Sequence, residues 1–136
     1  MENIFFSQPD IKDVLANHDL SKFGDAIVNF IYNAAVYRVK NVLQGVKVWD
    51  QSLAQVSRET SLRRLLGSGK NRGELGDAIE ALIAYSYLAK IFSIEEMISL
   101  LSDALKEVML TTENEIEQCT VMFTKLVLIL CSKFNL

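Results

Sequence analysis

The sequence predicts an all-α fold, and three observations support this prediction. Proline occurs once in 136 residues, at Pro9, so proline interrupts no helix beyond the N-terminus. Apolar residues recur at steps of three and four through most of the chain, and no alternating strand pattern of any length appears. Half of the residues are hydrophobic, which is enough for a core at this length. We therefore expect one domain, residues 1–136, of about seven helices.

The first two helices are predicted from capping residues and apolar spacing. A short helix over 10–16 has Pro9 at its start, where proline is well tolerated. Segment 17–19 breaks this helix and caps a long second helix over 20–40. The steps of three and four in the second helix predict a buried stripe made of Leu20, Phe23, Ile27, Phe30, Ile31 and Ala34.

The middle of the chain predicts two shorter helices and a loop. Asp50 is placed to cap a third helix over 51–60, and a short helical piece covers 61–66. Segment 67–73 contains three glycines among basic residues, so we expect an exposed, flexible, basic loop there.

The last three helices follow that loop. The fifth is predicted over 74–90. Ser93 to Glu96 has the form of a capping box and opens a sixth helix that ends near Met109. Thr112 to Glu115 has a similar form and opens a seventh helix that ends near Ser132.

Charge and cysteine usage narrow the class of protein. The net charge of -3 and the pI of about 5.2 argue against indiscriminate nucleic-acid binding, but they allow a local basic patch. Residues 1–6 lack the basic region of a secretory signal, and the apolar run 121–130 is shorter than the ~20 residues of a bilayer span. Cys119 and Cys131 would lie about 18 Å apart on one helix, too far to form a disulfide. These features predict a cytoplasmic protein with free thiols.

Two Gly-Asp pairs stand close to helix starts. They are Gly24-Asp25 and Gly76-Asp77, and Glu80 shares a helix face with Asp77. If the two helices pack side by side, Asp25, Asp77 and Glu80 can converge, and converging carboxylates suit a magnesium ion. The residues alone leave open a second interpretation, in which these acids are solvated and merely favoured by the helix dipole.

Three segments in order resemble motifs of the ribonuclease III domain family. Residues 20–29 (LSKFGDAIVN) resemble its signature segment, and residues 75–83 (LGDAIEALI) resemble its second acidic segment. Between them, residues 46–54 (VKVWDQSLA) resemble a further family segment. The resemblance covers about residues 20–100. The chain is similar to the stand-alone mini-ribonuclease III branch, which has no double-stranded-RNA-binding domain.

The resemblance implies a ribonuclease III-like fold, a function and a partner. Carboxylates matching Asp25, Asp77 and Glu80 hold Mg²⁺ (or Mn²⁺) in that family and are catalytic, acting in the hydrolysis of RNA phosphodiesters. It also implies structured or double-stranded RNA as the substrate and a homodimer as the assembly. No membrane partner is implied.

This chain departs from the family pattern in its acids. The family carries a glutamate four residues before the matched aspartate, and here that residue is Ser21. A further family glutamate has no aligned counterpart, since neither Asp50 nor Glu59 aligns with it. Glu74 is a hypothetical substitute that would act through a water molecule. The incomplete acidic set is expected to reduce activity.

Candidate RNA contacts lie around the glycine loop. Four cations cluster there and predict phosphate contacts, although a solvated loop is the alternative: Arg63, Arg64, Lys70 and Arg72. The single histidine, His18, is better interpreted as part of a helix junction than as a general base. Two other functions stay open: a non-catalytic module that binds RNA or a ribosome-assembly partner, and a helical dimerisation protein.

Overall fold

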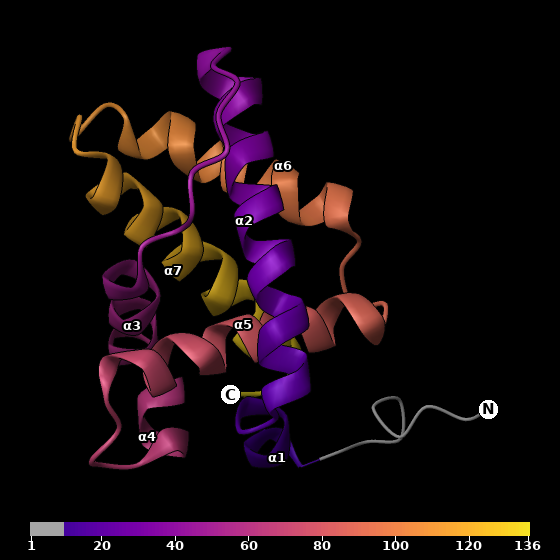
Figure 1. The fold of residues 1–136 in the computed structure, drawn as a ribbon. Helices are drawn as coiled ribbons and strands as arrows, with labels where there is room; N and C mark the ends of the chain where they lie inside the picture. Colours follow the sequence, from indigo (N-terminus) through magenta and orange to yellow (C-terminus); the bar gives the residue numbers. More distant parts are fainter. Residues whose placement is uncertain (1–9) are drawn as a thin grey trace.

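The computed structural model describes residues 10–136, and all regular secondary structure in this range is helical (Figure 1). The all-α prediction is therefore confirmed. The sequence-predicted helix start at Pro9 lies outside the described residues. The described helices are α1 (Ile11–Leu15), α2 (His18–Lys40), α3 (Asp50–Glu59), α4 (Leu62–Leu66), α5 (Arg72–Leu88), α6 (Ile94–Val108) and α7 (Glu115–Lys133).

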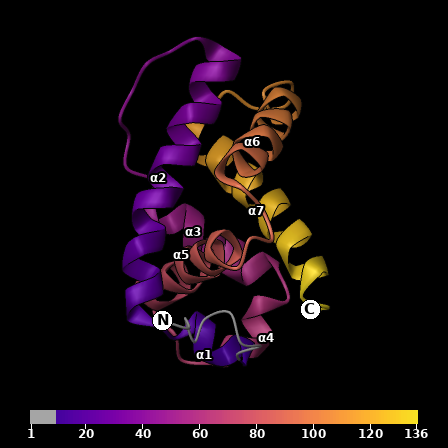
Figure 2. The ribbon, with the colours of Figure 1, turned by 90° about the vertical axis from the view of Figure 1, so that its right-hand side faces the viewer.

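Helix α5 is the centre of the fold. From Leu75 to Ser86 every residue is buried except Asp77. A helix that is apolar around its whole circumference must be covered on all sides, and α2 and α3 supply most of the cover. Figure 2 views α5 close to its own axis, with α2 on one side and α7 on the other. Helix α6 packs on α2 and α7 at the end of the fold that lies away from α1 (Figure 2).

The crossing of α2 and α5 depends on Gly24. A Cβ atom at this position would lie 1.9 Å from the carbonyl oxygen of Glu80, far inside van der Waals contact. The two backbones therefore touch directly where the helices cross, and no larger residue fits between them. This contact places Asp25, the next residue on α2, beside Glu80 on α5.

The segment that joins α2 to α3 is held along α2 by side-chain amides. We call residues 41–49 the strap; it begins at Asn41, whose φ of 57° ends α2 in the left-handed region. Asn33 accepts a hydrogen bond from the Val46 N–H (3.1 Å) and donates one to the Val46 carbonyl (2.8 Å). Asn29 accepts one from the Val48 N–H (2.7 Å). The strap therefore runs back along α2 and delivers the start of α3.

Two predicted caps are confirmed and two are wrong. Asn17 accepts a hydrogen bond from the Leu20 N–H (2.9 Å), and Ser93 forms a full capping box with Glu96. The structure caps α3 with the backbone of Trp49, so Asp50 is the first helical residue rather than the cap. Helix α7 is capped by Asn114 rather than by a box from Thr112. Both errors are small because several polar residues near a helix start can fill the cap position.

The predicted stripe on α2 is wrong at both phenylalanines. Phe23 is 45% exposed and Phe30 is 59% exposed, and Ala34 is only half-buried. The core side of α2 passes instead through Gly24 and Ala35, because these small residues let the neighbouring helices approach closely. The buried residues of α2 are Leu20, Ser21, Gly24, Ile27, Val28, Ile31, Tyr32, Ala35 and Val36.

Helix α7 behaves as a core helix. Cys119 and Cys131 are both buried and free, as predicted. Burial raises the pKa of the Cys119 thiol to about 12, so this thiol stays protonated at neutral pH.

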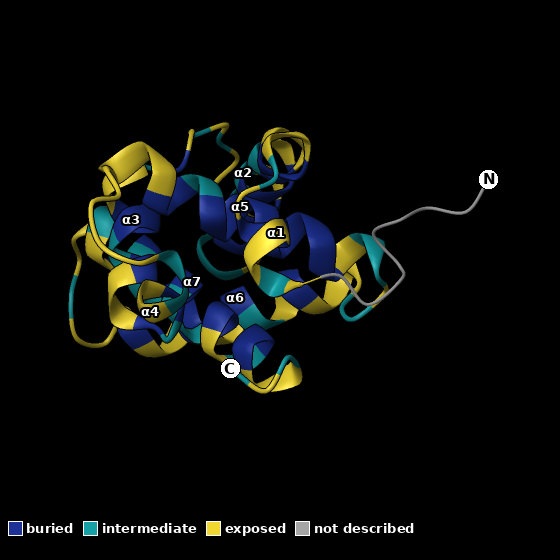
Figure 3. Cartoon of the chain, turned by 90° about the horizontal axis from the view of Figure 1, so that it is seen from below, coloured by how far each residue is buried: buried dark blue, intermediate teal, exposed yellow. Residues whose placement is uncertain are grey.

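In residues 10–136 no helix combines the length and the apolar character that crossing a bilayer requires. Figure 3 shows exposed stretches on α4 beside buried stretches of α3.

We predict that Gly24→Ala destabilises the protein by about 3 kcal/mol or more, because the added methyl group must push α2 away from the Glu80 backbone. Chemical unfolding followed by circular dichroism measures this. Gly45→Ala is the matched control, since a Cβ atom there would meet nothing within 4 Å, and it should change stability by less than about 0.5 kcal/mol. Equal stability of the two variants would contradict the close crossing.

Candidate functional site

Four carboxylates from three helices gather where α2 crosses α5. Asp25 comes from α2, Asp50 is the first residue of α3, and Asp77 and Glu80 come from α5. Glu80 lies among the others: it forms a hydrogen bond with Asp25 and feels the charges of Asp25, Asp77 and Asp50. We call these four residues the acidic site. The structure thus puts Glu80 within electrostatic reach of the other two sequence-predicted acids, Asp25 and Asp77, and of a fourth acid, Asp50.

Glu80 is the most perturbed member of the acidic site. Glu80 is only 8% exposed, and its backbone meets Gly24 of α2. Burial, the hydrogen bond with Asp25 and the nearby charges raise the pKa of Glu80 to about 9. At neutral pH the Glu80 carboxyl group is therefore protonated and can donate a hydrogen bond to the Asp25 carboxylate.

Asp25 is held from its own helix. It is half-buried, and its carboxylate accepts a hydrogen bond from the side-chain amide of Asn29, one turn along α2 (3.3 Å). Asp77 is half-buried and interrupts the otherwise buried surface of α5. Charged residues are rarely fully buried unless they are paired, and the half-buried Asp77 lines a pocket. An acid within an otherwise apolar run is thus a signal for Asp77 in the sequence, in addition to its spacing from Glu80.

Asp50 is the member of the acidic site that the sequence did not assign, because it does not align with the further family glutamate. It was expected to be a helix cap, and its exposed position at the start of α3 resembles many ordinary helix-start acids. Its approach to α5 depends on how the strap folds back, and its carbonyl lies about 4.0 Å from the Cβ position of Gly76. Local pattern carries no information on that path, so only the folded chain reveals the fourth acid.

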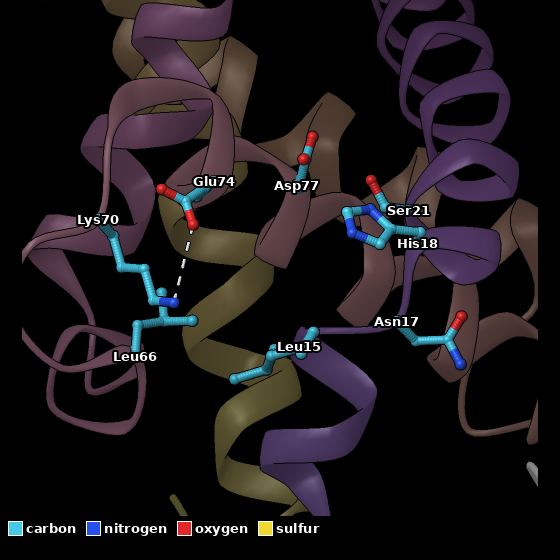
Figure 4. A pocket seen from close by; sticks show the side chains of 9 residues that line it. Leu15, Asn17, His18, Ser21, Leu66, Lys70, Glu74 and Asp77 are labelled. Carbon is cyan, nitrogen blue, oxygen red and sulfur yellow. Dashed lines mark ion pairs between the residues drawn. The ribbon is translucent and has the colours of Figure 1, made fainter.

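A pocket of about 230 Å³ opens beside the acidic site (Figure 4). Ser21 and His18 of α2 line one side, and Glu74 and Asp77 of α5 line another. Lys70 also lines the pocket and forms an ion pair with Glu74 (3.7 Å). Ser21, which stands where a glutamate was expected, therefore faces a space shared with Asp77.

Glu74 has structural partners of its own. Its carboxylate accepts a hydrogen bond from the Asn71 N–H (3.2 Å) within a capping box that starts α5. With Lys70 on its other side, Glu74 is already engaged. The structure therefore places Glu74 beside Asp77 but gives it the role of a helix cap. His18 is the exposed first residue of α2, as the helix-junction interpretation expects.

The chemistry of the acidic site suits a hard divalent cation. Carboxylate oxygens are the preferred ligands of Mg²⁺ and Mn²⁺, and a proton on Glu80 marks a place where negative charge lacks compensation. Among residues 10–136, however, no three His, Cys, Asp or Glu side chains stand close enough to hold a metal ion as they are. Binding would therefore require side-chain adjustment and release of the Glu80 proton.

The predicted cations lie around the same end of α5. Arg63 and Arg64 are exposed on α4, and Arg72 is the exposed first residue of α5. Lys70 lies in the loop between these helices. Gly67 and Gly69 give this loop two residues with positive φ (77° and 82°), which explains why glycine occupies them. Of these four cations, Lys70 lines the pocket beside the acidic site.

A comparison with protein-family models matches residues 18–136 to the family described as Ribonuclease III. The match includes all four members of the acidic site and every helix from α2 to α7. No curated protein matches the chain at the significance required.

We predict that Glu80→Gln stabilises the protein in metal-free buffer, increasingly so as the pH rises. In the unfolded chain the Glu80 carboxyl group ionises near pH 4.5, whereas in the folded protein it keeps its proton up to about pH 9. The stability of the wild type therefore decreases as the pH rises from 4.5 to 9. The glutamine does not titrate but can still donate to Asp25. Thermal unfolding with a chelator should show a melting temperature higher by about 4 °C or more at pH 8, and little difference at pH 4.5.

The control for this prediction is Glu113→Gln, which changes an exposed carboxylate in the loop before α7. Its melting temperature should follow that of the wild type at every pH. A pH-independent difference between Glu80→Gln and the wild type would mean that Glu80 is ionised in the folded protein.

Proposed function

This chain belongs to the ribonuclease III family, and we propose that it is a cytoplasmic RNA-processing enzyme that hydrolyses phosphodiesters in structured or double-stranded RNA with Mg²⁺ or Mn²⁺. The observation that carries the proposal is the convergence of Asp25, Asp50 and Asp77 on the buried Glu80 at the α2–α5 crossing.

The residues of the acidic site would share the work as follows. Asp25 and Asp77 are half-buried acids whose charges both act on Glu80, and they would provide anionic oxygen ligands. Glu80 would release its proton when a cation enters and become the third ligand. A bound divalent cation supplies an oriented water molecule and offsets the charge that develops on the phosphate.

Asp50 supports the proposal in spite of Ser21. Ser21 offers a hydroxyl group and no charge, so one carboxylate of the family pattern is absent from α2. Asp50 adds a negative charge that acts on Glu80 from α3 instead. We propose that Asp50 contributes to the charge that attracts a cation, while the pocket beside Ser21 admits water or part of the substrate.

The basic residues next to the acidic pocket support RNA as the partner. Arg63, Arg64 and Arg72 are exposed and free to contact phosphates, and they lie at the end of α5 that carries Asp77. Double-stranded RNA is recognised mainly by its shape and its phosphates, so these arginines would orient it through phosphate contacts.

We also propose a homodimer. The outward face of α2 exposes Phe23, Phe30 and Tyr37 at seven-residue intervals, and Tyr87 lies beside Phe23 with ring centroids 6.3 Å apart. Exposed aromatic residues repeated along one face of a helix favour contact with another protein surface. A monomer in analytical ultracentrifugation at micromolar concentration would rule this part out.

The second candidate is a non-catalytic ribonuclease III-like module that binds RNA or a ribosome-assembly partner. Two observations favour it: the serine at position 21, and the absence, in the described part of the chain, of three side chains already placed to hold a metal. Such a module would bind RNA without cleaving it even when Mg²⁺ or Mn²⁺ is supplied, which separates it from the enzyme.

We predict that Asp25→Asn and Asp77→Asn each reduce Mg²⁺-dependent cleavage of a structured RNA on the order of 100-fold or more, because each removes an anionic ligand. Cleavage is measured by gel electrophoresis of end-labelled RNA with Mg²⁺ and with Mn²⁺. Asp103→Asn, an exposed carboxylate on α6, is the control and should cleave like the wild type. RNA binding without cleavage in the wild type would select the non-catalytic module.

We predict that Arg72→Gln weakens binding to double-stranded RNA uniformly across sequences and reduces the salt slope of binding by about one, because one phosphate contact is lost. Fluorescence anisotropy over a range of salt concentrations measures this. Lys106→Gln, an exposed cation on α6, should leave both quantities unchanged. Equal effects of the two substitutions would place the RNA elsewhere.

A further inference from the structure

We propose that Asn29 is a positioning residue of the acidic site: its side-chain amide joins the Asp25 carboxylate to the strap that brings Asp50 to the site. The structural part of this inference rests on contacts of the described residues. The catalytic part rests on the function proposed above.

The two ends of the Asn29 amide have different partners. The nitrogen donates a hydrogen bond to the Asp25 carboxylate (3.3 Å), and the oxygen accepts one from the Val48 N–H (2.7 Å). These partners determine the orientation of the amide, because a carboxylate only accepts and a peptide N–H only donates. Asn29 therefore connects the acid on α2 to the strap with one side chain.

The geometry of the helix and the strap makes this connection regular. Asn29 and Asn33 are one turn apart on α2, about 6 Å along its axis. Their strap partners, Val48 and Val46, are two residues apart, and two residues of extended chain span about 6.6 Å. The strap runs antiparallel to α2, so the pair nearer the acidic site is Asn29 with Val48.

The strap is anchored at the Val48 position. The Val48 side chain is buried, and α3 begins two residues later at Asp50. In residues 10–136 no buried polar side-chain atom lacks a hydrogen-bond partner, which includes any buried atoms of this network. A shift of the Asn29 amide would therefore disturb Asp25 directly and the start of α3 through Val48.

Asn33 gives a matched comparison within the same network. It pairs with both the N–H and the carbonyl of Val46, and it also donates to the Asn29 carbonyl (2.7 Å). No hydrogen bond joins it to any of the four acids. Loss of Asn33 therefore weakens the strap without touching the acidic site, whereas loss of Asn29 affects both.

The first experiment tests the contacts without reference to activity. In NMR spectra, Asp25→Ala should shift the side-chain amide signals of Asn29 and leave those of Asn33 in place. Hydrogen exchange at Val48 should accelerate in Asn29→Ala, which has no acceptor, but stay slow in Asn29→Asp, which keeps an oxygen for the Val48 N–H. Unchanged Asn29 signals in Asp25→Ala would overturn the proposal.

The second experiment tests the positioning role with Mn²⁺ and a double-stranded RNA. Asn29→Ala should weaken Mn²⁺ binding about 10-fold, as loss of a residue that orients a metal ligand usually does. Asn29→Asp, which keeps the strap but removes the donor to Asp25, should lower kcat about 10-fold with little change in KM. Asn33→Ala should keep both constants within about twofold of the wild type.

The outcomes separate this inference from the proposed function. Wild-type-like cleavage by Asn29→Asp, or an equal loss in Asn33→Ala, would overturn the positioning role. If wild-type protein neither binds Mn²⁺ nor cleaves RNA, the proposed function fails, and the NMR comparison alone decides whether Asn29 links Asp25 to the strap.

Discussion

The contact between Gly24 and the Glu80 backbone is the constraint on which the rest of the structure depends. A helix crossing without side chains between the backbones brings two acid-bearing segments closer than ordinary helix packing allows. It buries Glu80 and puts it in hydrogen-bond contact with Asp25. It also selects the core side of α2, so that the small residues face inward and Phe23 and Phe30 face outward. One glycine thus determines both the packing of the central helix and the chemistry at its surface.

Such a crossing has an electrostatic consequence. Several carboxylates near a buried one cannot all be ionised without compensation, and here the compensation is a proton on Glu80, whose pKa is raised to about 9. A proton and a divalent cation compete for the same oxygens, so the acidic site is more stable empty at low pH and more receptive to a cation at high pH. The arrangement stores unfavourable charge interactions that folding of the surrounding helices must offset. That cost is easier to understand for a site that binds a cation than for a purely structural cluster.

Much of the fold follows from local sequence, whereas the site follows only in part. The helices are predictable because capping residues such as Asn17 and Ser93 act within one turn. Asp77 and Glu80 are predictable as a pair because they share a helix face. The outward phenylalanines were not predictable from spacing, because two adjacent stripes of α2 fit the same steps and packing decides between them. Asp50 and the strap were not predictable because they depend on Asn29 and Asn33, whose partners lie 13 or more residues away.

The position of Asp50 changes the meaning of Ser21. Counted along the signature segment, the chain lacks an acid, and a weaker site is the natural conclusion. Counted in space, Glu80 still interacts with three other carboxylates, one of which comes from α3. The serine leaves its pocket open beside Asp77, where a glutamate side chain would have filled part of the volume. The charges that act on Glu80 therefore come from three helices, and the Asn29 amide links Asp25 on α2 to the strap that leads to Asp50 on α3. A family motif with one acid missing is compatible with a complete charge cluster when the chain returns to the site by a second route.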